Sequence, residues 1–137
     1  MSVYLDANIL VSLISTDANT KAADAALRGL PEIFTSDFGG AEFASAISKR
    51  VRSRELRLSE AKAMLIEHDQ WIEAYANAVV VGPSDVARCS AYLRCLDLPL
   101  RTPDALHIAI ASRLGAQILS FDKQLRASAR KLGVAVV

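Results

Sequence analysis

The sequence predicts an α/β fold in which a mostly parallel sheet is covered by helices on both faces. Short runs rich in β-branched and aliphatic residues alternate with longer stretches whose apolar residues recur at helical spacing. Apolar residues make up 52% of the 137 residues and charged residues 23%, which is enough for a buried core and too little charge for a disordered chain. We therefore expect one domain over residues 1–137, a three-layer α/β/α sandwich with a five-stranded sheet (four to five strands) and about seven helices.

The N-terminal half is expected to hold two strands and four helices. In chain order these are a strand at 3–5, helices from about 8 and around 21–28, a strand at 33–35, and helices at 38–54 and from 59 onward. The third helix is indicated by Phe43, Ile47 and Val51, which recur every four residues and form one apolar stripe. Ser59 is the expected N-cap of the fourth helix, since a serine hydroxyl can accept a hydrogen bond from a first-turn N–H.

The C-terminal half is expected to hold three further strands and three helices. In chain order these are a strand at 78–81, helices capped by Ser84 and starting at Thr102, a strand at 117–120, a helix at 122–132 and a closing strand at 134–136. Pro103 supports the helix start at Thr102, because a proline in the first turn loses no hydrogen bond. Gly133 is expected to end the last helix.

Several classes of protein are disfavoured by the sequence. The longest stretch without a charged residue, 74–84, is shorter than the roughly 18 apolar residues of a membrane span. Asp6 interrupts the first apolar run, unlike an export signal, so we expect a cytoplasmic protein without a membrane span. Cys89 and Cys95 are too few for a disulfide scaffold and lack the spacing of a zinc site.

Four acidic residues follow predicted strands or open predicted helices. Asp6 comes directly after the first strand, Glu42 lies in the first turns of the helix after the second strand, Asp104 opens a helix, and Asp122 follows residues 118–121. Ligands of an open parallel sheet bind at the carboxyl ends of its strands, so these side chains can converge at one edge. Each also has a simpler explanation: Asp104 and Asp122 suit helix caps, and Glu42 is an ordinary first-turn glutamate. Asp6 is harder to explain in this way, because it ends what should be a buried strand.

Convergence of carboxylates would require protonation or a cation. Two unit charges about 4 Å apart repel by roughly 4 kcal/mol at an effective dielectric constant near 20. Oxygen ligands at this density suit a hard ion such as Mg²⁺ or Mn²⁺, which can activate water and stabilise the charge that develops on an attacked phosphodiester. If the four acids converge, the sequence therefore predicts either shared protons or a bound hard cation that could support hydrolysis.

Four segments carry a resemblance to a known family: VYLDANILV, SDFGGAEFASAISKR, RTPDALHIAIA and ILSFDKQL. In this order, and over nearly the whole chain, they resemble the four acidic blocks of the PIN domain and, more narrowly, of the VapC toxins of bacterial and archaeal toxin–antitoxin modules. The resemblance implies a PIN-like fold. It also implies that Mg²⁺ or Mn²⁺ is coordinated by a catalytic acidic quartet, namely Asp6, Glu42, Asp104 and Asp122.

The resemblance implies supporting residues, an activity and partners. Asn8 matches a small polar position and is expected to hold Asp6 or a ligand by hydrogen bonds, and Ser120 stands where the last block has Thr or Ser. The implied activity is metal-dependent endoribonuclease cleavage of RNA, typically tRNA or ribosomal RNA, which inhibits translation. The implied partners are a cognate VapB-like antitoxin, whose C-terminal arm blocks the site, and a second copy of the chain in a homodimer.

Basic residues and one histidine have less specific interpretations. Arg50 and Arg54 belong to a basic cluster at the end of the helix that carries Glu42, and Arg101 precedes the Asp104 helix. We expect contacts with RNA phosphates or with the antitoxin, or else a solvated helix end. Without the four acids, 11 acidic residues face 16 basic ones, so a net charge of +1 conceals +5 over the rest of the chain. His107 is expected to be a packed, hydrogen-bonded residue on an apolar helix.

Three other functions remain open from the sequence. A PIN-domain nuclease of RNA processing would use the same site without an antitoxin. A receiver-like signalling domain also binds Mg²⁺ through acids at strand ends, but it needs an adjacent acidic pair, whereas Leu5 and Ala7 flank Asp6. A non-catalytic interaction module would take up no divalent ion.

Overall fold

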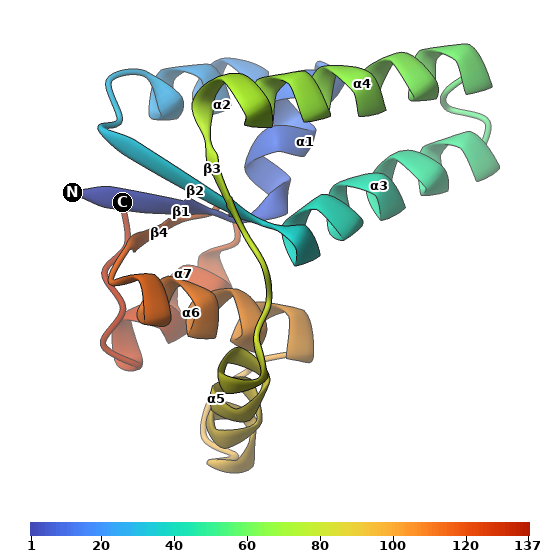
Figure 1. Ribbon diagram of the computed structural model, residues 1–137. Coiled ribbons are helices and arrows are strands. Elements are labelled where there is room, and N and C mark those ends of the chain that lie inside the picture. The colour runs from blue at the N-terminus through green and yellow to red at the C-terminus, as the bar shows by residue number, and fades with distance from the viewer.

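The computed structural model describes all 137 residues and contains four strands and seven helices. In chain order these are β1 (Ser2–Leu5), α1 (Ala7–Ser15), α2 (Thr20–Leu27), β2 (Glu32–Ser36), α3 (Asp37–Arg52), α4 (Leu58–Tyr75), β3 (Asn77–Val79), α5 (Pro83–Arg94), α6 (Thr102–Leu114), β4 (Gln117–Leu119) and α7 (Lys123–Lys131). Helices α1 to α4 cover one face of the sheet and α5 to α7 cover the other (Figure 1). The predicted three-layer α/β fold is confirmed. None of the helices is both long enough and apolar enough to cross a bilayer.

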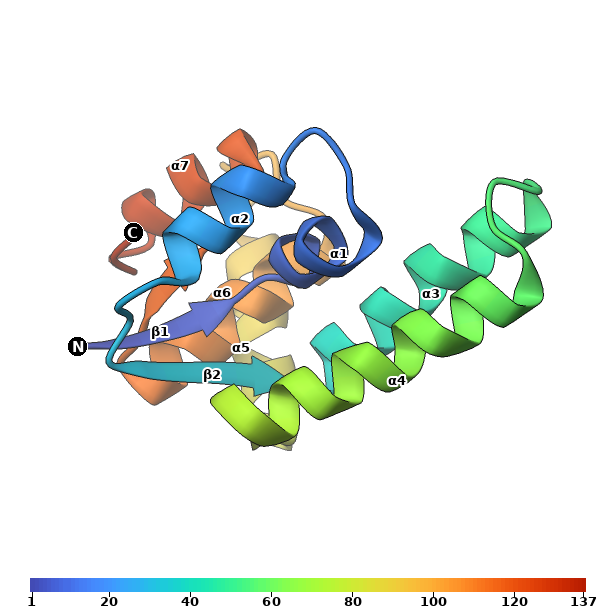
Figure 2. The same ribbon diagram turned by 90° about the horizontal axis from the view of Figure 1, so that it is seen from above.

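The sheet is parallel throughout and has the strand order β3-β2-β1-β4. Figure 2 shows β1 and β2 side by side and pointing in the same direction. From β1 the chain moves outward to β2 and β3 through α1 to α4, and then returns through α5 and α6 to β4 on the other side of β1. The direction of winding therefore reverses between β1 and β4. The crevice at the carboxyl ends of two such strands is where parallel α/β sheets bind ligands.

The side chains of β1 alternate between two apolar cores. Val3 and Leu5 pack into the core beneath α1 to α4, and Tyr4 packs into the core beneath α5 to α7. A strand that is buried on both faces reads as a continuous apolar run, which is why the sequence at 3–5 predicts a central strand. Asp6 follows this strand immediately, so its carboxyl group lies at the edge of the buried sheet.

Two helices begin earlier than the sequence predicts. The N-cap residues of α4 and α5 are Arg57 and Gly82, in place of the expected Ser59 and Ser84. In both helices an acid at the third helical position accepts a hydrogen bond from the N–H of the cap residue, and this contact stabilises the earlier start. The two acids are Glu60 and Asp85, with N–H to carboxylate distances of 3.1 and 2.9 Å.

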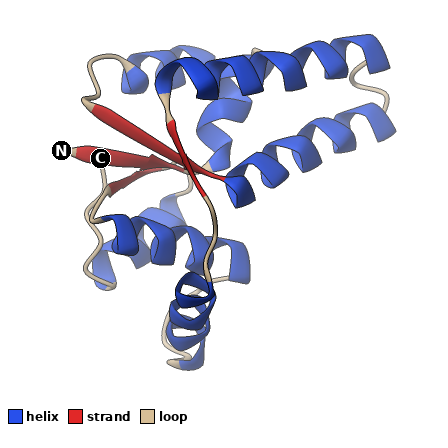
Figure 3. Ribbon diagram, viewed as in Figure 1, coloured by secondary structure: helices blue, strands red, loops and turns tan.

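The predicted closing strand at 134–136 is reduced to a single parallel bridge between Ile118 and Val136. Residues after α7 run along β4 as a loop (Figure 3). The N–H of Ile118 donates to the carbonyl of Ala135 at 2.9 Å, and its carbonyl accepts from Val137 at 3.1 Å. Strand β4 has three residues, and only the middle one, Ile118, directs both its N–H and its carbonyl away from β1. The outer edge of β4 can therefore form just one bridge.

Gly115 ends α6 in a left-handed conformation, with φ of 62°. No atom lies within 4 Å of a Cβ added there, so only the backbone conformation resists a side chain. We expect Gly115→Ala to lower the free energy of unfolding by about 1 kcal/mol, as measured by urea unfolding. Gly40→Ala inside α3 is the matched control. Its Cβ would meet His68 at an ordinary 3.9 Å, so the same change there should raise stability by about 0.5 kcal/mol or more. Equal effects at both positions would contradict this account.

Candidate functional site

Asp6 lies at the carboxyl end of β1 and is 8% exposed. Its N–H donates to the carbonyl of Leu119 at 3.0 Å, which continues the pairing of β1 with β4 by one residue. The hydroxyl of Ser120, just beyond β4, donates to Oδ2 of Asp6 at 2.6 Å. Asn8 donates from Nδ2 to Ser120 Oγ at 3.2 Å and accepts from the N–H of Phe121 at 3.3 Å. Ser120 therefore holds the Asp6 carboxylate directly, and Asn8 acts one contact further away.

The environment of Asp6 makes its negative charge costly. Burial raises the pKa of the Asp6 carboxyl group above its ordinary value, and the nearby charge of Glu42 raises it further. His107 and the hydroxyl of Ser120 act in the opposite direction without cancelling the effect of burial. A cation bound beside Asp6 would favour the ionised form and remove much of this cost.

Glu42 extends from α3 toward His107 on α6. Oε1 of Glu42 is hydrogen-bonded to Nε2 of His107, which also lies 3.6 Å from Oδ1 of Asp6. Asp6, Glu42 and His107 each offer one ligand atom, and these atoms all lie within 4.8 Å of one another. The carboxylates of Asp6 and Glu42 at this separation fit a divalent cation such as Mn²⁺ or Mg²⁺, and His107 is hydrogen-bonded to Glu42 beside them. We call Asp6, Glu42 and His107 the acidic cluster.

The other two predicted acids cap helices. Oδ2 of Asp104 accepts from the N–H of Arg101 at 3.3 Å, and Oδ1 of Asp122 accepts from the N–H groups of Gln124 and Leu125 at 2.9 and 3.1 Å. Neither carboxylate joins the group of ligand atoms described above, so the expected convergence of four acids is realised for Asp6 and Glu42 alone. The physical reason is that the N–H of the cap residue Arg101 holds the carboxylate of Asp104, while free N–H groups of the first turn of α7 hold that of Asp122.

Both capping acids are nevertheless connected to the acidic cluster. Asp104 is close to it along the chain, and Asp122 shares a hydrogen-bond partner with it. Asp104 precedes His107 by three residues, which puts the two side chains on the same face of α6. Asp122 donates its backbone N–H to Ser120 Oγ at 3.0 Å, the same hydroxyl that binds Asp6.

His107 has a partner that its sequence context did not indicate. As expected, it is a packed and hydrogen-bonded residue, with 1% exposure. Its Nδ1 lies 2.7 Å from the hydroxyl of Tyr4, and that hydroxyl lies 2.8 Å from Ser36 Oγ. Burial raises the pKa of Tyr4 far above its ordinary value, so Tyr4 keeps its proton. The one sequence signal for a role at the site is the position of His107 one helical turn after Asp104.

The predicted basic contacts lie in two places. Arg101 pairs with Asp104, with Nε 3.6 Å from Oδ2, at the start of α6. Arg50 is near the end of α3 and Arg54 is in the turn before α4, where the α3–α4 hairpin extends beyond the sheet (Figure 2). Eight helical residues separate Glu42 from Arg50, which amounts to about 12 Å along the axis of α3. Arg50 and Arg54 therefore lie some distance from Glu42, whereas Arg101 contacts one of the four predicted acids.

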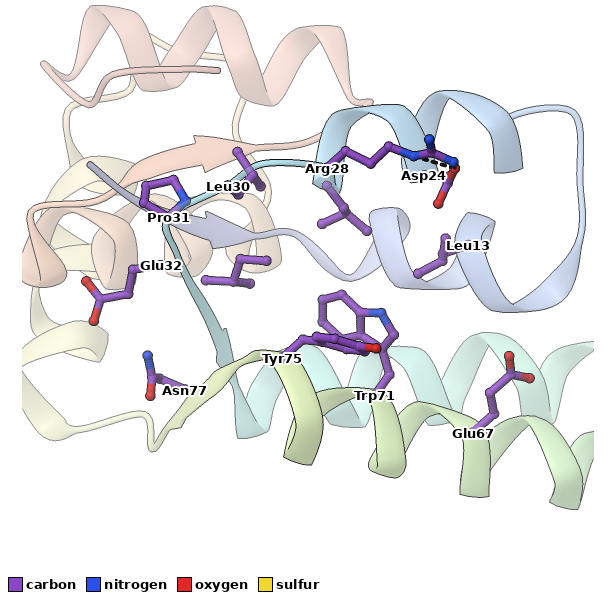
Figure 4. Close-up of a pocket in the computed structure, with 12 residues that line it drawn as sticks. Leu13, Asp24, Arg28, Leu30, Pro31, Glu32, Glu67, Trp71, Tyr75 and Asn77 are labelled. Carbon is purple, nitrogen blue, oxygen red and sulfur yellow. Dashed lines mark hydrogen bonds and ion pairs between the residues drawn. The ribbon is translucent and has the colours of Figure 1, made fainter.

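A groove of about 680 Å³ contains none of the predicted site residues. Figure 4 shows it between α2 and α4, with the rings of Trp71 and Tyr75 extending into it from α4. Apolar residues such as Leu13 and Leu27 share the lining with four charged side chains. These are Asp24, Arg28, Glu32 and Glu67. An open groove of mixed character suits a polypeptide segment better than a small ligand.

Comparisons with known proteins agree with the fold. The family model of the PIN domain matches residues 3–131. Ribonuclease VapC3 of Pyrobaculum aerophilum is 27% identical over 125 residues, which cover 91% of this chain and 92% of that protein. The solved structure of VapC20 of Mycobacterium tuberculosis, a sarcin-ricin loop cleaving toxin, has a TM-score of 0.74 at 18% identity and covers 92% of this chain and 94% of its own. FitAcB of Neisseria gonorrhoeae has a TM-score of 0.72 at 17% identity, with 98% and 95% covered. Because the PIN model spans nearly all of the sequence, the chain belongs to the PIN-domain family.

Proposed function

We propose that this chain is a metal-dependent endoribonuclease and the toxin of a toxin–antitoxin module, built as a single nuclease domain over residues 1–137. One observation carries the proposal. The carboxylate of Asp6 is buried at the reversal point of the sheet, and Glu42 lies within ligand distance of it. Membership in the PIN family and similarity to Ribonuclease VapC3 support RNA as the substrate.

In this proposal Asp6 and Glu42 hold Mg²⁺ or Mn²⁺, and Asp104 and Asp122 supply further carboxylates. The bound ion lowers the pKa of a water molecule and stabilises the negative charge that forms at the attacked phosphodiester. Ser120 keeps the Asp6 carboxylate in one orientation, with Asn8 behind it. Arg101 neutralises a phosphate next to the scissile one, and Arg50 and Arg54 bind the RNA backbone further along the strand.

A cognate VapB-like antitoxin is the proposed partner. A solved structural neighbour is described as VapBC2 of Rickettsia felis bound to a promoter DNA fragment, with a TM-score of 0.71 at 15% identity. We assign the arm of the antitoxin to the groove of Figure 4, since an amphipathic segment could bury apolar side chains against Trp71 while its charged residues meet Asp24, Arg28 and Glu67. A homodimer and a cytoplasmic location complete the proposal.

The test is cleavage of RNA by the purified protein with and without a divalent ion. We expect cleavage in Mn²⁺ or Mg²⁺ and its loss in EDTA, because the ion would activate the attacking water and stabilise the charge on the phosphodiester. The exposed acid Asp97 provides the control, since Asp97→Asn should leave the rate unchanged. Sequencing of RNA ends after brief expression without antitoxin identifies which tRNA or ribosomal RNA is cut. Undiminished cleavage in EDTA would exclude the metal, and the absence of both cleavage and ion uptake would favour a non-catalytic interaction module.

A further inference from the structure

We infer that His107 is a positioning residue that holds Glu42 in its metal-binding orientation, and that a hydrogen-bond chain through Tyr4 and Ser36 sets the tautomer of its imidazole. This inference rests on the metal site of the proposed function. The chain joins three parts of the fold, since Tyr4 belongs to β1, Ser36 ends β2, and His107 lies on α6. None of the three side chains is itself among the acids predicted to bind the ion.

The imidazole of His107 is fixed by its surroundings. Its ring is inclined to those of Tyr4 and Phe38, with centroid distances of 5.6 and 5.3 Å. Both ring nitrogens have partners, Nδ1 with Tyr4 and Nε2 with Glu42. A side chain with 1% exposure and packed rings on two sides has little freedom to rotate, so the direction of Nε2 is set by the core of the protein.

The direction of the hydrogen bonds follows from counting donors. The N–H of Gly39 donates to Ser36 Oγ at 3.0 Å, and we assign the serine hydroxyl as the donor to Tyr4, which agrees with the acceptor at the other end of the chain, the carboxylate of Glu42. Tyr4 then donates its own proton to Nδ1 of His107, and Nε2 carries the imidazole proton. That proton faces the carboxylate of Glu42, which can only accept. The opposite tautomer would set a lone pair of Nε2 against a lone pair of the carboxylate.

The same serine also starts the helix that carries Glu42. Ser36 is the N-cap of α3, and its oxygen binds Gly39 in the first turn. Glu42 follows six residues after the cap, with its side chain 31% exposed. A partly exposed glutamate has several accessible rotamers, and holding one of them in advance reduces the entropy lost when an ion binds. Ser36 therefore sets the helix that carries Glu42 and, through Tyr4 and His107, the orientation of its carboxylate.

The test measures Mn²⁺ binding to the metal-free protein by calorimetry, without RNA. We expect His107→Ala to weaken binding by about 10- to 100-fold, the usual cost of losing a residue that orients a ligand. His107→Gln should recover most of the affinity, because the glutamine amide can donate to Glu42 from nearly the same place as Nε2. Tyr4→Phe removes one hydroxyl and leaves the imidazole in place, so we expect it to weaken binding by less than His107→Ala does, by about 3- to 10-fold.

Nitrogen-15 NMR of the imidazole supplies a second measurement that packing alone would not change. In the native protein His107 should show the tautomer protonated at Nε2, and in Tyr4→Phe a mixture of both tautomers. His68→Gln and Tyr92→Phe are the matched controls, one for each residue type. His68 is also buried but stacks on Phe43, and Tyr92 packs at the edge of the core that contains Tyr4, outside the hydrogen-bond chain, so neither should alter Mn²⁺ affinity.

The outcomes separate this inference from the proposed function. Absence of Mn²⁺ uptake by the native protein would overturn both. If the native protein and His107→Ala bind Mn²⁺ with equal affinity, the inference alone would be overturned. If His107→Ala does not fold, which circular dichroism would show, Tyr4→Phe decides: an unchanged tautomer and an unchanged affinity would overturn the role of the hydrogen-bond chain.

Discussion

Replacement of Asp6 by asparagine is expected to lower the rate of RNA cleavage by at least about 100-fold. An ion held at the reacting phosphate contributes several kcal/mol to the transition state, and each 1.4 kcal/mol is about a factor of ten in rate. Asparagine has the size of aspartate and can still accept the hydrogen bond from Ser120, so the loss arises from the missing charge. The measurement is the initial rate of cleavage at saturating Mn²⁺, with Asp97→Asn as the control.

The same variant should not be less stable than the native protein when the metal is removed. Burial raises the pKa of Asp6 in the folded state, so the folded protein binds this proton more tightly than the unfolded chain. The ionised carboxylate therefore destabilises the fold increasingly as the pH rises from about 4, the unfolded value, through the raised pKa. Asparagine lacks this cost. Urea unfolding in EDTA should show Asp6→Asn at least as stable as the native protein at pH 7, with the difference vanishing below pH 4. If Asp6→Asn is less stable than the native protein at pH 7, its loss of cleavage would be explained by unfolding and not by the missing charge.

Replacement of Arg113 by methionine is expected to lower the free energy of unfolding by about 2–4 kcal/mol at pH 7. Arg113 forms two hydrogen bonds with Asp85, Nε to Oδ1 at 2.7 Å and Nη2 to Oδ2 at 2.9 Å. The side chain of Asp85 is 1% exposed, so removal of its partner leaves a buried, unpaired carboxylate. This pair also joins α5 to α6, and α6 carries His107. Urea unfolding measures the change.

The destabilisation in Arg113→Met should depend on pH. Burial by itself raises the pKa of Asp85, but the hydrogen bonds from Arg113 and Gly82 and the charge of Arg113 bring it below its ordinary value. The pair therefore stabilises the fold above the unfolded pKa of about 4 and loses its effect as the pH falls through the lowered folded value. The difference in the free energy of unfolding between the native protein and Arg113→Met should be large at pH 7 and small at pH 3. Arg28→Met, which breaks an exposed pair with Asp24, should cost less than about 1 kcal/mol at either pH. A gap that stays constant with pH would contradict this explanation.

The fold could be predicted from local features because each element has its own signal. Val3 to Leu5 is an apolar run, and the run marks a strand that is buried on both faces. Helix starts were less accurate, since several residues near each start can act as caps. Ser59 and Ser84 are good caps by residue type, yet Glu60 and Asp85 stabilise starts two residues earlier. The prediction of a closing strand at 134–136 was wrong for a geometric reason. Strand β4 has three residues, and only Ile118 can form a bridge at its outer edge.

The candidate site was likewise predictable only in part from the sequence. By itself the sequence determined that Asp6 ends a central strand and that Glu42 lies early in the next helix after a strand, because the order of strands and helices places both at one edge of a parallel sheet. Only the tertiary structure decided which side chains meet there. Asp104 and Asp122 cap their own helices, whereas His107 contacts Glu42 across 65 residues and Tyr4 across 103. Spacing along a chain reports contacts within a strand or a helix, and a hydrogen bond between two helices on opposite faces of a sheet depends on how both pack against it.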